Sequence, residues 1–334
     1  MTTTLPLPTA VNLREVGPRD GLQIERPIPT AEKLRLLELL VRSGLKRIEA
    51  TAFVSPRAVP AMADAREVAA VLHQWPDVQW SALVASEGGA HRALEAGIRN
   101  IEYVVSAADG HSHANVKRPT AESLAGVGRI ADLVHDAGGT CEVIVATAWD
   151  CPFDGPTADD RVLHIAREAV SQGADALCLG DTIGTATPLR VVQLIGAVQE
   201  IAPRIPVGLH LHNTRGAGLA CVLAALQIGV VDIDASIGGL GGCPFAPGAG
   251  GNVPTEELVY LCEEMGVATG CDLDALVEAA GFAQRAVGRE LPSGVLKAGG
   301  RRRAHLSSAP ACLRVLPAPR MPAPARRPPT AEAI

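Results

Sequence analysis

Aromatic side chains are scarce in this chain, at 3% of 334 residues, and no cluster of basic residues is interleaved with them. A surface that stacks nucleobases needs such aromatic side chains, so the sequence argues against a nucleic-acid partner. The formal net charge of −6 indicates the same, because binding to a phosphate backbone favours a basic surface.

Long apolar runs and paired cysteines are also missing. No uncharged apolar stretch reaches the roughly 18–20 residues of a membrane span, and the first residues lack the charged and apolar regions of a signal peptide. The eight cysteines are spread along the chain without a CxxC pair, a pattern typical of neither a zinc knuckle nor a secreted disulfide framework. We therefore expect a cytoplasmic protein with reduced thiols and no membrane partner.

The chain instead shows a regular alternation of short apolar runs with longer amphipathic stretches, which predicts strands that alternate with helices. The predicted strands cover residues 11–16, 47–51, 79–84, 100–105, 140–147, 174–179, 207–212 and 231–236. The predicted helices include residues 30–43, 61–73, 89–96, 121–137, 158–171, 188–201 and 216–228. Three of these helices are followed by a glycine that suits a left-handed cap, namely Gly44, Gly97 and Gly229.

Eight strands that are each followed by a helical segment favour a (β/α)8 TIM barrel over an open, doubly wound sheet. Residues that carry chemistry follow several strands rather than one switch point, which is typical of a barrel. We predict a barrel domain over residues 8–298 and a Pro/Arg-rich tail over residues 299–334. From Arg301 onward the tail has seven arginines, seven prolines and one glutamate, with no helical period, so we expect it to be disordered.

His210 and His212 lie at the end of one predicted strand, where residues two apart point to the same face. Such a pair can hold one divalent metal ion, although a His-x-His pair alone is also compatible with histidines that bind nothing. Arg19 and Asp20 follow the first predicted strand and add a guanidinium and a carboxylate. Because barrel enzymes place their sites at the carboxyl ends of their strands, this combination predicts a metal-assisted active site.

Two further acids, Glu49 and Asp181, lie at the second and sixth predicted strands. Unpaired polar groups are costly on such apolar strands, so each acid should contact a metal ion or another partner. A role in the site and an internal salt bridge to a barrel lysine or arginine both remain open for these two residues.

Residues 238–252 are rich in glycine but match neither the G-x-x-x-x-G-K-[ST] pattern nor a G-x-G-x-x-G spacing after the first strand. They therefore predict a mobile loop rather than a phosphate-binding loop. Cys243 lies in this segment between Gly242 and Pro244, and it is a candidate proton donor. A structural cysteine without function is the alternative interpretation.

Five segments together resemble the 3-hydroxy-3-methylglutaryl-CoA lyase family of metal-dependent barrel lyases. In order, they are EVGPRDGLQ (15–23), EATAFVSP (49–56), LGDTIG (179–184), HLHN (210–213) and GGLGGCPFAPGAGGN (238–252). The resemblance covers about residues 10–298. It implies cleavage of (S)-3-hydroxy-3-methylglutaryl-CoA to acetoacetate and acetyl-CoA, an acyl-CoA substrate, a homodimer, and a place in leucine catabolism and ketone body metabolism.

The resemblance also assigns roles to residues at matching positions of this sequence. It implies four ligands of a Mg2+ or Mn2+ ion, namely Asp20, His210, His212 and Asn252. It implies that Arg19 stabilises the enolate oxygen, that Cys243 protonates the product carbanion, and that Glu49 and Asp181 control the proton of the substrate hydroxyl. We expect substrate contacts from Arg19, Gln23 and Arg26.

The identity of the substrate's acyl group remains open, because residues 107–115, residues 149–153 and Ala58 depart from the sequence that is usual in the family. A lyase for a related 3-hydroxy-3-alkylglutaryl-CoA or for citramalyl-CoA is the first alternative. A Claisen-type synthase that condenses acetyl-CoA with a 2-keto acid is the second, and the Cys243 segment argues against it. A catalytically inactive scaffold is disfavoured, because every implied metal ligand is present.

Overall fold

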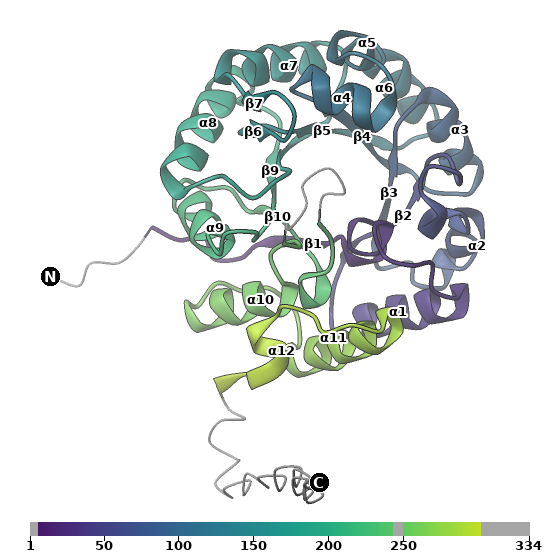
Figure 1. The fold of residues 1–334 in the computed structure, drawn as a ribbon, viewed down its shortest axis with the longest axis vertical. Coiled ribbons are helices and arrows are strands. Elements are labelled where there is room, and N and C mark those ends of the chain that lie inside the picture. The colour runs from purple at the N-terminus through teal and green to yellow at the C-terminus, as the bar shows by residue number, and fades with distance from the viewer. Residues whose placement is uncertain (1–5, 243–249, 302–334) are drawn as a thin grey trace, which may run out of the picture. The chain divides into compact units, whose positions relative to one another are not determined.

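The computed structural model describes residues 6–242 and 250–301, and within them eight parallel strands form a closed barrel (Figure 1). Around the barrel the strands follow the order β1-β10-β9-β8-β5-β4-β3-β2. They are β1 (Asn12–Glu15), β2 (Arg47–Phe53), β3 (Gln79–Val84), β4 (Asn100–Ser106), β5 (Thr140–Ala146), β8 (Ala176–Asp181), β9 (Val207–Leu211) and β10 (Asp232–Ala235). The predicted (β/α)8 TIM barrel is confirmed.

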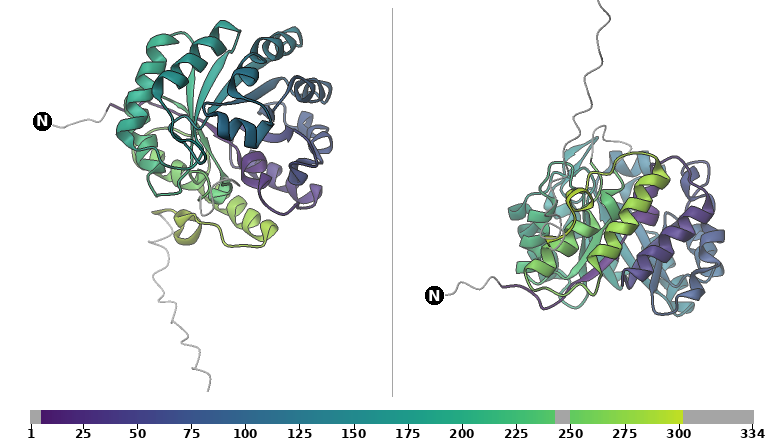
Figure 2. Two further views of the ribbon diagram at one scale, coloured as in Figure 1. Left: turned by 45° about the horizontal axis from the view of Figure 1, so that its top comes forward. Right: turned by 90° about the horizontal axis from the view of Figure 1, so that it is seen from below.

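Helices surround the strands, as Figures 1 and 2 show. Among the described residues, nine helices extend over eight or more residues: α1 (Thr30–Arg42), α3 (Glu87–Glu95), α4 (Asp109–Val116), α6 (Val127–Asp136), α7 (Asp159–Ser171), α8 (Pro188–Ile201), α9 (Gly218–Gln227), α10 (Thr255–Glu264) and α11 (Leu273–Val287). The other elements are α2 (Ala65–Ala69), α5 (Thr120–Leu124), α12 (Gly294–Ala298), the single-turn π-helix η1 (Gly17–Gly21), the 3-10 turns η2 (Pro60–Met62), η3 (Leu72–Gln74) and η4 (Ile237–Gly239), and the hairpin of β6 (Asp150–Cys151) with β7 (Gly155–Pro156). No helix in the described part of the chain is long and apolar enough to cross a membrane.

The predicted strands lie within a few residues of the observed ones, whereas two predicted helices are broken. Residues 61–73 form a 3-10 turn, the short α2 and a second 3-10 turn, and residues 121–137 divide into α5 and α6. The predicted caps are confirmed, because Gly44, Gly97 and Gly229 have φ of 95°, 95° and 85°. Helix α12 is the last helix within the predicted bounds of the barrel domain, and residues 302–334 of the predicted tail lie outside the described residues.

The interior of the barrel is charged, while the apolar core lies between the strands and the surrounding helices. On β4 and β5, Glu102 and Glu142 are directly paired in the strand register, and on β1 and β10 Arg14 is paired with Asp234. Arg14 forms ion pairs with all three of these acids. A single guanidinium therefore links carboxylates from three other strands across the barrel axis.

Candidate metal centre and active site

Asp20, His210 and His212 meet at the carboxyl ends of β1 and β9. Each offers one ligand atom that lies within 4.8 Å of the other two, and all three side chains are buried. Asp20 belongs to η1, which begins two residues after β1, and one of its oxygens, Oδ2, lies 3.8 Å from Nε2 of each histidine. The three residues therefore form a compact group with the donor atoms that a divalent cation binds.

Asn252 completes this group from the strand-like segment beside β9, where it forms a bridge pair with His212. Its Nδ2 donates to Asp20 Oδ2 at 2.7 Å, whereas its Oδ1 is buried and has no hydrogen-bond partner among the described residues. A buried amide oxygen without a donor is costly, and a cation would supply the missing partner. Together with one carboxylate and two imidazoles, this oxygen fits Mg2+ or Mn2+.

Asp234 on β10 orients the first of the two histidines. Its Oδ2 lies 3.0 Å from His210 Nδ1, so Nδ1 carries the proton and Nε2 presents its lone pair to the metal-ligand group. This contact was not predicted from the sequence. The sequence does contain an indication of this contact, because Asp234 is an acid inside the apolar run 231–236.

Arg19 links the metal-ligand group to Glu49. Its NH1 donates to Asp20 Oδ1 at 2.7 Å, and its Nε lies 2.6 Å from Glu49 Oε1. Gln23 donates to the same Asp20 oxygen at 2.8 Å. Burial alone would raise the pKa of Asp20, but Arg19 and the two histidines hold it well below its usual value. A salt bridge of Glu49 and a role of Glu49 in the site do not exclude each other, because its ion-pair partner is Arg19, the predicted catalytic arginine.

Asp181, Arg26 and Cys243 have different surroundings. Asp181 ends β8, and its two oxygens accept the backbone N–H groups of Thr185 and Ala186 at 3.0 and 2.9 Å. Burial raises its pKa, and no ion pair joins it to a basic residue in the described part of the chain. Arg26 is exposed and makes no described contact with the group. Cys243 lies outside the described residues.

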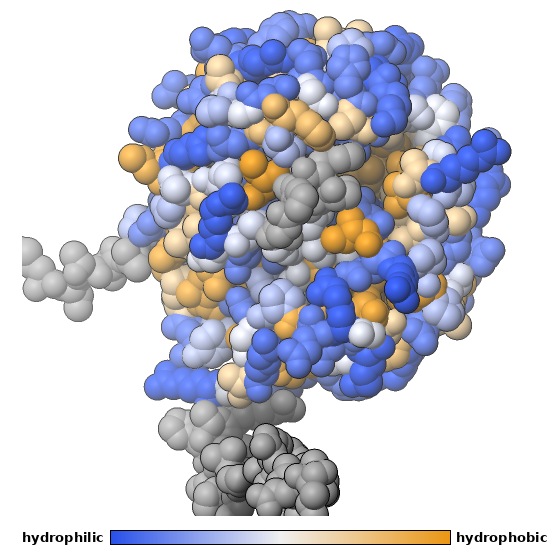
Figure 3. Space-filling model, in the orientation of Figure 1, coloured by the Kyte–Doolittle hydropathy of each residue, from blue (hydrophilic) through white to orange (hydrophobic). Residues whose placement is uncertain are grey.

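Glycine keeps the segment before Cys243 close to the site. Gly241 has φ of 113°, and a Cβ at this position would lie 2.5 Å from Asn252 Nδ2 and 3.1 Å from Asp20 Oδ2. Only glycine allows the backbone to approach these two side chains so closely. Figure 3 shows one face of the protein, on which hydrophilic and hydrophobic residues lie side by side.

Glu15 connects three segments near the site through hydrogen bonds. Its Oε1 accepts the backbone N–H groups of Gly17 and Ile237 at 2.7 and 2.8 Å, and its Oε2 accepts the hydroxyl of Thr255 at 2.6 Å. Burial raises the pKa of Glu15 to about 7 despite these donors. Above that pH, the barrel must hold a buried carboxylate without a cationic partner among its described hydrogen bonds.

We expect Glu15→Gln to flatten the pH dependence of stability. Between pH 4.5 and about 7 the folded protein retains a proton on Glu15 that the unfolded chain has lost, so the stability falls as the pH rises. The shift corresponds to roughly 3 kcal/mol. Glutamine can keep the two backbone hydrogen bonds through its oxygen and donate from Nε2 to the hydroxyl of Thr255, so the variant should melt at a higher temperature than the parent at pH 8 but not at pH 4. A parallel decline of both proteins with pH would contradict this assignment.

Fold and side chains together define a (β/α)8 barrel protein with a candidate divalent-metal centre at the carboxyl ends of its strands. The model of the HMGL-like family matches residues 10–282, and the chain belongs to this family, as predicted. It is 42% identical over 301 residues to (R)-citramalyl-CoA lyase of Chloroflexus aurantiacus, covering 87% of this chain and 95% of that relative.

Hydroxymethylglutaryl-CoA lyase YngG of Bacillus subtilis is 38% identical over 290 residues, covering 86% of this chain and 97% of the relative. Among solved structures, an HMG-CoA lyase of Acinetobacter baumannii in complex with coenzyme A and 3-methylmalate superposes with a TM-score of 0.84 and 40% identity. That match covers 88% of this chain and 96% of the other. The relatives therefore include lyases for two different acyl-CoA substrates.

Proposed function

We propose that this protein is a metal-dependent lyase that cleaves (S)-3-hydroxy-3-methylglutaryl-CoA to acetoacetate and acetyl-CoA. The observation that carries the proposal is the buried group of Asp20, His210 and His212 beside Arg19, in a chain of the HMGL-like family. With Asn252, these residues would hold Mg2+ or Mn2+. The bound ion would supply Lewis acidity that lowers the pKa of the substrate's tertiary hydroxyl.

The chain's own residues account for the proton transfers. Glu49 is the base we assign, because its Oε2 is buried and receives no hydrogen bond from a described protein donor, whereas both Asp181 oxygens accept backbone N–H groups. When Glu49 takes the hydroxyl proton, the carbon–carbon bond breaks and its electron pair moves to the acetyl-CoA fragment as an enolate. Arg19 stays charged and stabilises the enolate oxygen. Cys243 then donates a proton to the enolate carbon.

Citramalyl-CoA is the second candidate substrate, and the relative that is 42% identical favours it. Both substrates carry a hydroxyl and a methyl group on carbon 3 and a terminal carboxylate, and both release acetyl-CoA. The citramalyl compound is one carbon shorter and yields pyruvate instead of acetoacetate. The same residues can therefore serve either reaction.

A substrate panel tests the proposal. Purified protein with Mg2+ and a thiol reductant should form acetoacetate and acetyl-CoA from 3-hydroxy-3-methylglutaryl-CoA, and excess chelator should abolish the product. Pyruvate from citramalyl-CoA without acetoacetate from the longer substrate would transfer the assignment to the second candidate. Thiol release from acetyl-CoA in the presence of 2-keto acids, with no cleavage of either substrate, would instead identify a synthase.

We also propose a homodimer and a cytoplasmic location. Sedimentation velocity of the purified protein and fractionation of the producing cells test these two points directly.

A further inference from the structure

The guanidinium group of Arg14 lies inside the barrel and holds Asp234 through two parallel hydrogen bonds. Its Nε donates to Asp234 Oδ1 at 2.7 Å, and its Nη2 donates to Asp234 Oδ2 at 2.9 Å. A guanidinium that contacts both oxygens in this way fixes the plane of the carboxylate as well as its position. Apart from Arg14 and His210, the Asp234 side chain has one further donor among the described residues, the weakly donating thiol of Cys178 at 3.9 Å. The orientation of Asp234 therefore depends mainly on Arg14.

Asp234 in turn contacts the metal-ligand group. Its Oδ2, which accepts from Arg14 Nη2, also lies 3.0 Å from Nδ1 of His210. This contact fixes the imidazole ring with Nε2 on the side of Asp20, whose Oδ2 lies 3.8 Å away. His212 has no equivalent contact, because its Nδ1 is buried without a hydrogen-bond partner in the described part of the chain. Of the two histidines, His210 is therefore the one whose orientation depends on charged groups inside the barrel.

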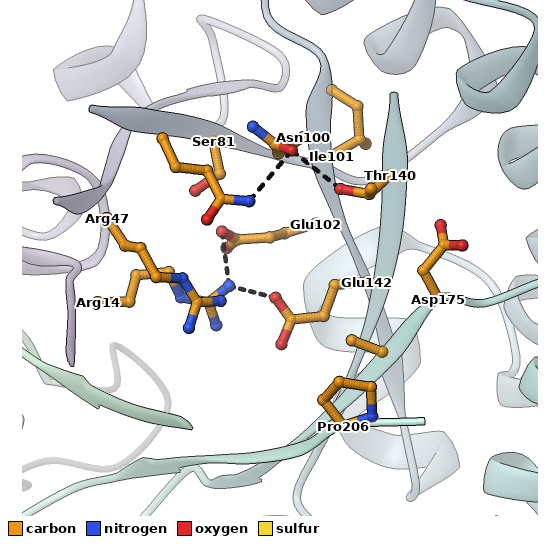
Figure 4. Close-up of a pocket in the computed structure, with 12 residues that line it drawn as sticks. Arg14, Arg47, Ser81, Asn100, Ile101, Glu102, Thr140, Glu142, Asp175 and Pro206 are labelled. Carbon is orange, nitrogen blue, oxygen red and sulfur yellow. Dashed lines mark hydrogen bonds and ion pairs between the residues drawn. The ribbon is translucent and has the colours of Figure 1, made fainter. Parts of the chain in front are cut away.

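Two glutamates hold Arg14 from the strands across the barrel. Its Nη1 donates to Glu102 Oε1 on β4 at 2.8 Å and to Glu142 Oε2 on β5, as Figure 4 shows. We call Arg14, Glu102, Glu142 and Asp234 the interior cluster. Arg14, Glu102 and Asp234 are buried, so water competes little for these hydrogen bonds. An unbroken series of hydrogen bonds thus leads from β4 and β5 through Arg14 and Asp234 to His210 on β9.

We propose that Arg14 is a positioning residue for the metal centre and that it acts on His210 through Asp234. By fixing the Asp234 carboxylate, Arg14 keeps the His210 ring in the orientation that presents Nε2 to the ion. Loss of the group that orients a ligating histidine typically weakens metal binding by about 10–100-fold. The inference rests on the metal centre of the proposed function, but it does not depend on which acyl-CoA is the substrate.

Charge compensation is the alternative role for Arg14, because the guanidinium neutralises acids that are buried inside the barrel. Lysine separates the two roles. Its ammonium group carries the same charge, but it is a single point charge and cannot form the two parallel hydrogen bonds to Asp234. If Arg14 only compensates charge, Arg14→Lys should bind metal as the parent does. If Arg14 orients Asp234, Arg14→Lys should bind metal more weakly although the protein stays folded.

A cavity beside Arg14 allows the missing group to be replaced from solution, and it also provides a matched control. The cavity measures about 210 Å3, far more than the about 10–15 Å3 that one water needs, and it is lined by Arg14 and Arg47 near the amino ends of the strands. Arg47 is paired with Arg14 in the strand register and forms an ion pair with Asp232. The described side-chain hydrogen bonds do not connect Asp232 with His210. Arg47 thus shares the cavity and the kind of partner, but not the connection to the metal centre.

Calorimetric titration with Mn2+ tests the proposal without any turnover. We expect the dissociation constant to rise by about 10-fold or more in Arg14→Ala and by a smaller factor in Arg14→Lys, and to keep the parent value in Arg47→Ala. Millimolar guanidinium chloride should restore much of the affinity of Arg14→Ala, because the free ion can occupy the space of the missing side chain, whereas sodium chloride at the same concentration should not. In an Asp234→Asn background, Arg14→Lys should cause no further loss, since Arg14 acts through Asp234.

Parent-like Mn2+ affinity in Arg14→Lys that is folded by circular dichroism would overturn the proposal, and so would an equal loss of affinity in Arg47→Ala. If Arg14→Ala does not fold, Arg14→Lys and the Asp234→Asn background still decide the question. Mn2+ binding by a parent protein that cleaves no tested substrate would reject the proposed lyase function alone. A parent protein that binds no Mn2+ would overturn both the metal centre and the role of Arg14.

Discussion

Asp20→Ala should lower the turnover of the lyase reaction by several orders of magnitude and abolish tight Mn2+ binding, while the barrel remains folded. Asp20 supplies the only carboxylate of the candidate metal-ligand group among the described residues, and it also orders Arg19, Gln23 and Asn252 through hydrogen bonds. Its removal therefore eliminates one ligand and releases three neighbours. The fold should survive because barrel stability rests mainly on packed side chains away from the catalytic face.

Calorimetric titration with Mn2+, circular dichroism and the acetoacetate assay measure these three effects separately. Asp232→Ala provides a matched control, since Asp232 begins β10 at the opposite end of the barrel and pairs with Arg47. The control should keep its Mn2+ affinity. Near-normal activity and metal affinity in Asp20→Ala would show that the ligand assignment is wrong.

Local periodicity was enough to predict the barrel, because each strand is a short apolar run between segments with helical spacing. Breaks inside helices were not predicted. Ala125 and Gly126, for example, separate α5 from α6 although the apolar spacing continues across them. Such a break depends on how the segment packs against the barrel, which spacing along the chain does not describe.

Asp20, His210 and His212 were predicted as candidate metal ligands because they follow or end strands, and the ends of parallel strands meet at one face of a barrel. Asn252 was predicted from the family resemblance alone. The interior cluster was not predicted, although Arg14, Glu102 and Glu142 are visible in the sequence as charges within apolar runs. Their spacing along the chain does not show which of these side chains contact one another in the folded protein. Only the closure of the barrel brings Arg14 against acids that are 88 and 128 positions away in the sequence.

Replacement of Cys243 by serine should reduce kcat by about 10²–10⁴-fold, the usual contribution of a positioned general acid, and leave substrate binding nearly unchanged. A serine hydroxyl is a far weaker acid than a thiol, so it cannot protonate the acetyl-CoA enolate at a useful rate. Cys243 follows Gly241 by two residues, and Gly241 adjoins Asp20 and Asn252. Cys271→Ser is the matched control and should retain full activity, because Cys271 lies beside Gly44, which precedes β2 and so lies at the end of the barrel opposite the site.

Chemical modification gives an independent measurement of the same role. Five of the six described cysteines are buried, and the remaining one, Cys271, is partly buried. Burial raises the thiol pKa of Cys141 to about 12 and that of Cys221, Cys262 and Cys271 to about 11, so these residues hold little of the thiolate that reacts with alkylating agents near neutral pH.

An alkylating agent at neutral pH should therefore inactivate the protein through Cys243, and an acetyl-CoA analogue should protect it. Mass spectrometry of the modified protein identifies the labelled residue, and the peptide that contains residue 243 should carry the label in Cys271→Ser but not in Cys243→Ser. Full turnover in Cys243→Ser, combined with inactivation by a label on another cysteine, would assign the proton donor to that other residue. The glycine-rich segment would then serve only to cover the substrate, because its backbone still adjoins the metal-ligand group through Gly241.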